Sequence, residues 1–140
     1  PTGAGVRWLV PMFLAAIMIP LPAKAAEGPC TGYEWKRPPE VARMIRCVWP
    51  RFHVRHGGPR KALSVGRCES GLRWDAYGNG NGGVFQHRLV YWPSRYRYYI
   101  ERNRLRRSWG LPGSVYSART NVIVTALMVR RGGWGSWACA

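Results

Sequence analysis

Four cysteines constrain how this chain of 140 residues can fold: Cys30, Cys47, Cys68 and Cys139. An even number of cysteines in a small chain is typical of paired disulfides, and four cysteines allow three pairings. The tail before Cys139 has three glycines within residues 132–138, too many to hold itself as a helix or strand. The tail therefore needs a tether. A bond from Cys139 to Cys68 would supply it, which leaves Cys30 to pair with Cys47.

The N-terminal residues have the pattern of an export signal. Arg7 precedes an uncharged run from Trp8 to Leu21, and residues 23–25 supply small side chains in the Ala-x-Ala pattern. The run is shorter than the roughly 20 residues that span a bilayer, and its two prolines would break a buried helix. We therefore predict a signal peptide over residues 1–25, cleaved after Ala25, with the translation start upstream of Pro1. The mature protein is expected to be secreted, with no transmembrane span.

The chain is strongly basic, with 22 Lys and Arg against six Asp and Glu and a formal net charge of +16. An exported cation of this kind concentrates on polyanions, so we expect anionic cell-wall polymers as partners. Nucleic acid is the weaker alternative, because no recognised nucleic-acid motif is present and export argues against it. Arginine-rich composition can also serve solubility alone.

The mature chain is long enough for one domain and too short for two. We assign residues 26–55 to an N-terminal segment with the first helix, and residues 56–140 to the core with its Trp/Cys tail, and we expect a monomer. No Cys-x-x-Cys occurs, and His53 and His56 lie on a Gly- and Pro-flanked loop without a matching thiol pair. We therefore expect no metal and no cofactor.

Apolar periodicity predicts a mainly α-helical domain. Val41, Ile45 and Val48 share one face of a helix that follows Pro38-Pro39 and ends at Trp49-Pro50. Further helices are expected over about 60–70 and 93–106, and a last one, which could also be a buried strand, after an N-cap at Ser117. Residues 77–83, with four glycines and two asparagines, are predicted to be irregular.

Two sets of side chains in these helices bear on function. Glu69 closes the second predicted helix, on the border of its apolar stripe, just before the glycine-rich loop. Burial favours the neutral, proton-donating form of a carboxyl group, so Glu69 is interpreted as a catalytic acid. Trp92, Tyr96 and Tyr99 recur at helical spacing and could pack in the core or stack on sugar rings.

Several motifs then follow one another in order: Cys68 to Leu72 (Cys-Glu-Ser-Gly-Leu), Gly83 to Gln86 (Gly-Val-Phe-Gln), Tyr91-Trp92, Ser117 to Asn121, and the closing Gly-Gly-Trp-x-x-Trp-x-Cys. Together they resemble the lytic transglycosylase-like members of the lysozyme superfamily, over residues 41–139. The resemblance implies a goose-lysozyme-like α fold with a sugar-binding cleft. It also implies cleavage of the β-1,4 bond between N-acetylmuramic acid and N-acetylglucosamine in peptidoglycan glycan strands.

The same resemblance assigns roles to single residues. Glu69 falls on the family's catalytic glutamate, Gln86 on a motif glutamine, and Asn121 on an asparagine that contacts the substrate acetamido group. The remaining substrate-binding residues implied by these motifs are Ser70, Phe85, Tyr91 and Trp92. Two departures from the pattern are Val84, in place of Leu or Met, and Ser117-Ala118, in place of a frequent Asp-Pro.

The count of acids bears on the mechanism. A two-acid hydrolase needs a second carboxylate about 5–9.5 Å from the first, and only Asp75 and Glu101 follow Glu69. Asp75 is expected to face away, and Glu101 to lie among arginines on an outer face. A single acid suits a transglycosylase that forms a 1,6-anhydro sugar. Plain hydrolysis and a non-enzymatic cationic wall-binding protein remain the alternatives.

Overall fold

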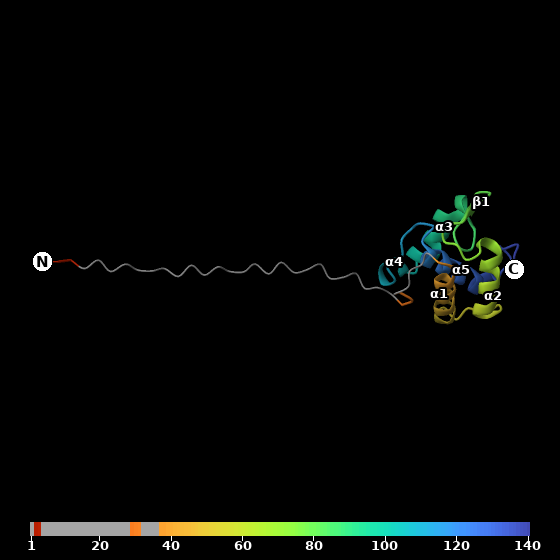
Figure 1. Ribbon diagram of the computed structural model, residues 1–140, viewed down its shortest axis with the longest axis horizontal. Coiled ribbons are helices and arrows are strands. Elements are labelled where there is room, and N and C mark those ends of the chain that lie inside the picture. The colour runs from red at the N-terminus through yellow and green to blue at the C-terminus, as the bar shows by residue number, and fades with distance from the viewer. Residues whose placement is uncertain (1, 4–28, 32–36) are drawn as a thin grey trace.

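The computed structural model describes residues 2–3, 29–31 and 37–140. Helices dominate this part of the chain, a small three-stranded sheet lies among them, and two disulfides are present. The mainly α fold class is therefore confirmed at this level. Helix α1 (Pro38–Arg51) packs against α2 (Gly58–Ser70) and against α5 (Ala118–Gly132), as Figure 1 shows.

The predicted signal peptide and its cleavage site lie outside the described residues, apart from residues 2–3. Within the described ranges, no helix combines the length and apolar character that a membrane span requires.

The first two helices follow the sequence pattern closely. Val41, Ile45 and Val48 are completely buried, which confirms the apolar face of α1. The helix runs on to Arg51, beyond the predicted end, because Pro50 is accommodated within its last turn. Helix α2 starts at Gly58, two residues earlier than predicted, and ends where Gly71 takes a left-handed conformation with φ 66°, which glycine adopts without steric cost.

The glycine-rich segment was predicted to be irregular, and this prediction is wrong. It contains β1 (Tyr77–Gly78) and β2 (Asn81–Gly82), which pair with each other in an antiparallel hairpin, and β2 pairs in turn with β3 (His87–Arg88). The hairpin loop is Asn79-Gly80, with φ 50° and 75°. Asn-Gly is the favoured pair for such a two-residue turn, because both residues tolerate positive φ.

The single helix predicted over 93–106 is also wrong, because the chain there forms several short pieces. A 3₁₀ turn (Leu89–Tyr91) leads into α3 (Trp92–Tyr96), followed by the π-helical turn η2 (Arg97–Glu101) and α4 (Leu105–Ser108). Arg104 breaks the helix with φ 58°. The Asn103 amide donates to the carbonyl of Tyr99 at 2.9 Å, and such side-chain competition for backbone groups interrupts helices.

Helix α5 is the central helix of the domain. The Ser117 side chain accepts a hydrogen bond from the Thr120 backbone N–H, which confirms the predicted N-cap. Val122, Ile123 and Val124 are consecutive and all completely buried. A helix buried on all sides lacks an amphipathic period, and this is why the sequence pattern also allowed a strand.

Candidate active site

A cavity of about 400 Å³ opens beside the end of α2, a volume typical of small-ligand sites. It is bordered by the end of α2, the small sheet, α3 with the 3₁₀ turn before it, and the C-terminal tail. Among the described residues that line it, Glu69 is the only carboxylate, and two arginines accompany it. The full described lining is Glu69, Asn81, Gln86, Arg88, Tyr91, Arg95, Ser136, Trp137 and Ala138.

Glu69 is half-buried in the last turn of α2. Its Oε1 accepts a hydrogen bond from the backbone N–H of Cys139 at 3.4 Å. The neighbouring Cys68 forms a disulfide with Cys139, and Cys30 pairs with Cys47. Both predicted pairings are thus confirmed, and the first fixes the tail beside the acid.

The tail is held in place by two indole rings as well as by the disulfide. Trp137 Nε1 donates to the carbonyl of Phe85 at 2.9 Å, and Trp134 stacks on Trp49 with ring centroids 5.7 Å apart. Trp137 thereby becomes part of the cavity wall. The tail lacks regular structure of its own, so these contacts explain how it contributes a fixed surface.

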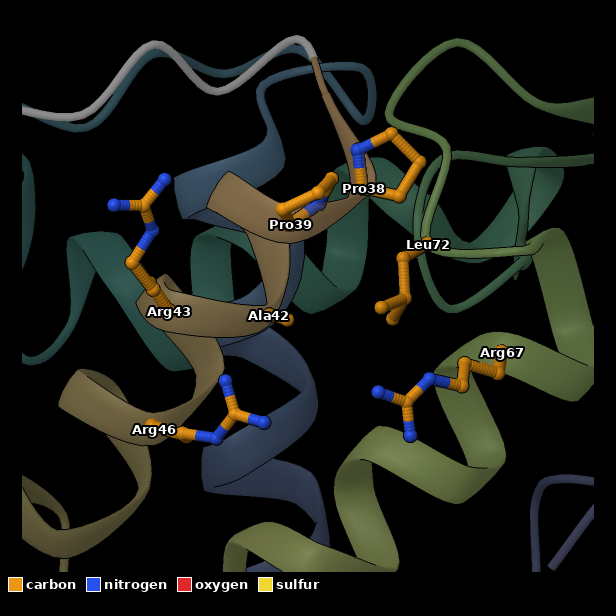
Figure 2. Close-up of a pocket in the computed structure, with 7 residues that line it drawn as sticks. All are labelled: Pro38, Pro39, Ala42, Arg43, Arg46, Arg67 and Leu72. Atoms are coloured by element: carbon orange, nitrogen blue, oxygen red, sulfur yellow. The ribbon is translucent and has the colours of Figure 1, made fainter.

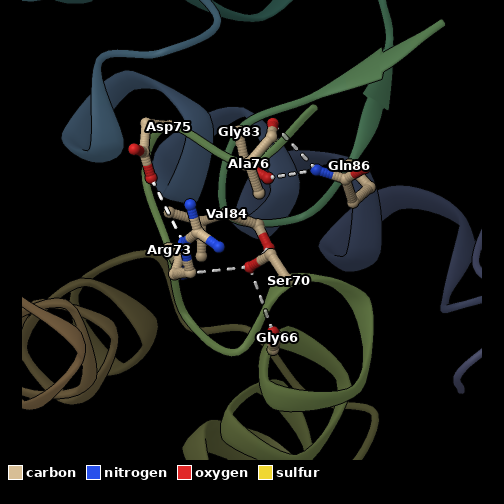
Figure 3. A network of polar contacts seen from close by, with 8 residues as sticks. All are labelled: Gly66, Ser70, Arg73, Asp75, Ala76, Gly83, Val84 and Gln86. Atoms are coloured by element: carbon tan, nitrogen blue, oxygen red, sulfur yellow. Dashed lines mark hydrogen bonds and ion pairs between the residues drawn. The ribbon is translucent and has the colours of Figure 1, made fainter. Parts of the chain in front are cut away.

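Gln86 lines the cavity, as its predicted role requires. The residue has a left-handed backbone with φ 48°, and its Nε2 donates to the carbonyls of Gly83 at 2.9 Å and Ala76 at 3.1 Å. Figure 3 shows these two bonds bridging the loop on both sides of the hairpin. The bonds stabilise an unusual backbone conformation and hold the amide beside the cavity.

Three other residues with predicted substrate roles lie behind the cavity and support it. The Ser70 hydroxyl donates to the carbonyl of Val84 at 2.6 Å, tying the end of α2 to the loop. Phe85 is completely buried in the core. Trp92 is buried, with its Nε1 bonded to the carbonyl of Gly113 at 2.7 Å. Phe85 and Trp92 are too deeply buried for their predicted substrate contacts, whereas Ser70 is half-buried and its hydroxyl is occupied by the carbonyl of Val84.

Asn121 is likewise buried, with no exposed surface. Its Oδ1 accepts from the Phe85 backbone N–H at 3.0 Å, and its Nδ2 donates to the carbonyl of Val115 at 3.0 Å. A side chain so enclosed and bonded cannot also reach a sugar acetamido group. In this structure the Asn121 side chain forms hydrogen bonds with the backbone groups of Phe85 and Val115. Gly83 lies so close to this amide that a Cβ there would collide with it.

The sequence allowed the aromatic stripe of Trp92, Tyr96 and Tyr99 either to pack in the core or to stack on sugar rings. Trp92 and Tyr96 are buried in the core, and Tyr99 is half-buried against it, so core packing explains the helical spacing. Tyr91, in contrast, is 54% exposed and lines the cavity. Tyr91 is therefore the aromatic ring of this segment that a ligand in this cavity can contact.

His87 was not recognised from the sequence. It is buried, its Nε2 lies 2.7 Å from Thr125 Oγ1, and its Nδ1 lies 2.8 Å from Nη1 of Arg95. Burial, assisted by the charge of Arg95, lowers the pKa of His87 to about 3. His87 is therefore neutral, with Nδ1 accepting from Arg95 and Nε2 donating to Thr125. No motif in the sequence predicts the contacts of His87 with Arg95 and Thr125, because the three residues lie on β3, α3 and α5.

The other two candidate acids lie elsewhere. Asp75 is exposed and pairs with Arg73 at 3.5 Å. Glu101 pairs with Arg106 at 3.5 Å and lines a separate cavity among arginines, as predicted. In the described part of the chain, no three His, Cys, Asp or Glu side chains gather closely enough to hold a metal ion.

A second cavity, of about 470 Å³, lies between α1 and α2 (Figure 2). Arg67, on α2, contributes to it. Arg67 and Glu69 are two residues apart, a rotation of about 200°, so they point to opposite sides of the helix. The described lining offers cations and apolar surface but no acid or nucleophile, which suits attraction of anions rather than catalysis. Its described residues are Pro38, Pro39, Ala42, Arg43, Arg46, Arg67 and Leu72.

Comparisons with known proteins do not identify a family. No protein-family model, no curated protein and no solved structure matches this chain. The candidate site therefore stands on its own residues and their contacts.

Proposed function

We propose that this chain is an exported enzyme that cleaves the β-1,4 bond between N-acetylmuramic acid and N-acetylglucosamine in peptidoglycan, with Glu69 as the catalytic acid. The observation that carries the proposal is the position of Glu69, as the only carboxylate among the described residues lining a ligand-sized cavity. The order of motifs that resembles the transglycosylase-like proteins of the lysozyme superfamily supports the same reaction.

The reaction needs one group that first gives and then takes a proton. Glu69 donates its proton to the glycosidic oxygen, the bond from that oxygen to C1 of the muramic acid breaks, and the leaving sugar departs as an alcohol. The Glu69 carboxylate then accepts the proton of the C6 hydroxyl as this oxygen bonds to C1. The product is a 1,6-anhydro sugar, and no water is consumed.

The surroundings of Glu69 suit a sugar ligand. Asn81 offers an amide group and Gln86 offers its amide oxygen for hydroxyl and acetamido groups, while the exposed ring of Tyr91 offers an apolar face. The cavity thus combines a few polar groups with an aromatic surface, as carbohydrate sites require.

We propose cyclisation rather than hydrolysis because the described residues lining the cavity include no second carboxylate beside Glu69. A hydrolase of the two-carboxylate type needs a second acid about 5–9.5 Å from the first. Asp75 and Glu101 are each paired with an arginine and neither is among the described residues lining the cavity. A held C6 hydroxyl, by contrast, has an effective molarity of up to about 10⁵–10⁸ M.

Digestion of purified peptidoglycan tests both parts of the proposal. We expect wild-type protein to release products lighter by one water than those of a lysozyme, and Glu69→Gln to lose about 10²-fold or more of the rate. Asp75→Asn is the matched control, since it also neutralises an acid but lies outside the cavity, and it should keep its activity.

The result also separates the two alternatives. Incorporation of labelled oxygen from water into the new reducing ends would show hydrolysis. Binding to walls without any cleavage, unchanged in Glu69→Gln, would show a non-enzymatic cationic protein, a function favoured by the net charge of +16. Retention of more than about a tenth of wild-type rate in Glu69→Gln would remove Glu69 from its assigned role.

A further inference from the structure

Arg95 brings a positive charge to the wall of the cavity that contains Glu69. The side chain is half-buried, and its Nη1 donates to Nδ1 of His87 at 2.8 Å. Its guanidinium carbon lies 5.8 Å from the ring centroid of Tyr91. Burial lowers the pKa of Arg95 from its usual value, yet arginine stays protonated in proteins at neutral pH. A partly desolvated cation therefore faces the cavity.

This cation has no anionic partner within the part of the chain that the structure describes. The described ion pairs use other arginines, as in Arg73 with Asp75 and Arg106 with Glu101. Glu69 lines the same cavity but forms no ion pair with Arg95 there. Withdrawing a charge from water without a counter-charge is unfavourable. An anionic ligand would offset that cost.

The arrangement around His87 holds Arg95 in one orientation. The His87 ring is fixed by Thr125, whose hydroxyl donates onward to the carbonyl of Asn121 at 2.8 Å. The ring also packs edge-on against Trp92 and Trp137, with centroids 5.1 and 5.8 Å away. An acceptor fixed in this way orients the guanidinium before a ligand arrives, and such preorganisation raises affinity.

We propose that Arg95 forms a carboxylate-binding position in the Glu69 cavity, so that the protein selects glycans whose muramic acid carries an acid group. The inference rests on the proposed function. The shared ligand chemistry is a carboxylate attached to the muramic acid, either on its lactyl group or on the stem peptide. A guanidinium pairs with a carboxylate through two parallel hydrogen bonds, whereas a neutral chitin strand offers no such group.

Binding to the Glu69→Gln protein tests this without cleavage. Calorimetry compares four soluble ligands: a peptide-free muramyl glycan with a free lactyl carboxylate, its methyl ester, a glycan with stem peptides, and a chitin oligosaccharide. We expect the better of the two acid ligands to bind about 10- to 100-fold more tightly than the ester and the chitin, the range for a hydrogen bond to a charged group.

Variants made in the same Glu69→Gln background assign the preference to one side chain. Arg95→Gln should reduce it to less than about threefold, and Arg95→Lys should keep part of it, because the charge remains while the paired geometry is lost. Arg107→Gln is the matched control, since Arg107 is exposed beside the separate Glu101 cavity and its loss should leave the preference intact. Thermal unfolding of each variant checks the fold.

Each outcome decides the inference. A preference for the free lactyl acid over its ester identifies the lactyl carboxylate, and a preference confined to peptide-bearing glycans identifies the stem peptide. Equal binding of acid and neutral ligands, or an undiminished preference in Arg95→Gln, overturns the inference and leaves the proposed function standing. If no glycan binds at all, both fail. Should Arg95→Gln not fold, the acid and ester comparison with Arg95→Lys still decides.

Discussion

Acidification should destabilise this protein through His87. The folded state keeps this imidazole neutral, with its pKa lowered to about 3, while in the unfolded chain it takes the ordinary value of 6.5. As the pH falls below 6.5, the unfolded state binds a proton that the folded state does not bind, so stability decreases until the pH reaches about 3. Between pH 7 and pH 4.5 this linkage amounts to a loss of about 2–3 kcal/mol.

Urea unfolding at both pH values measures the loss. Because other groups also titrate over this range, the informative quantity is the difference between wild type and His87→Gln, whose amide can accept and donate hydrogen bonds but does not titrate. The variant should lose about 2–3 kcal/mol less than wild type on acidification. His53→Asn is the control, since it removes an exposed histidine at a left-handed position that asparagine tolerates. Equal acid sensitivity of His87→Gln and wild type would refute the reasoning.

Three further predictions concern the architecture of the site. Cys139→Ser removes a disulfide that spans 71 residues, so we expect the protein to lose about 4 kcal/mol of stability through the entropy of the unfolded chain. Urea unfolding should show a lower midpoint, and activity should fall because the tail forms part of the cavity wall. A midpoint equal to that of wild type would contradict this. Gly83→Ala places a Cβ against the Asn121 amide at a backbone φ of 78°, and should cost at least about 2 kcal/mol; an unchanged melting temperature would argue against the close contact. Trp137→Phe removes the hydrogen bond to the Phe85 carbonyl and should cost about 1–3 kcal/mol, with weaker glycan binding measured by calorimetry; unaltered binding would show that the indole is not needed to form the wall.

The sequence was sufficient for features that depend on local pattern. The buried face of α1 follows from the spacing of Val41, Ile45 and Val48, and the start of α5 follows from the capping chemistry of Ser117. The Cys68–Cys139 bond followed from a tail that cannot order itself. In each case the physical cause lies within a few residues or in one covalent requirement.

The roles of the predicted ligand residues required the tertiary structure. Motif position predicted that Phe85 and Asn121 contact a substrate, but burial is a property of the packed fold, and both side chains are completely buried. The Asn79-Gly80 hairpin was readable in principle from the turn chemistry. The end of the helix at Arg104 could not be predicted, because the apolar residues keep a helical spacing in the sequence even where the backbone leaves the helical conformation.

The sequence by itself thus determined the helical face of α1, the N-cap of α5 and the pairing of the cysteines, while the role of Glu69 as an acid stays a prediction. Only the tertiary structure decided that Arg95 and Trp137 stand around Glu69, since they are 26 and 68 residues away from it in the chain. The tertiary structure alone revealed that Arg95 donates a hydrogen bond to a neutral His87. The physical reason is that desolvation and charge pairing depend on distances through space, which the order of residues along the chain does not specify.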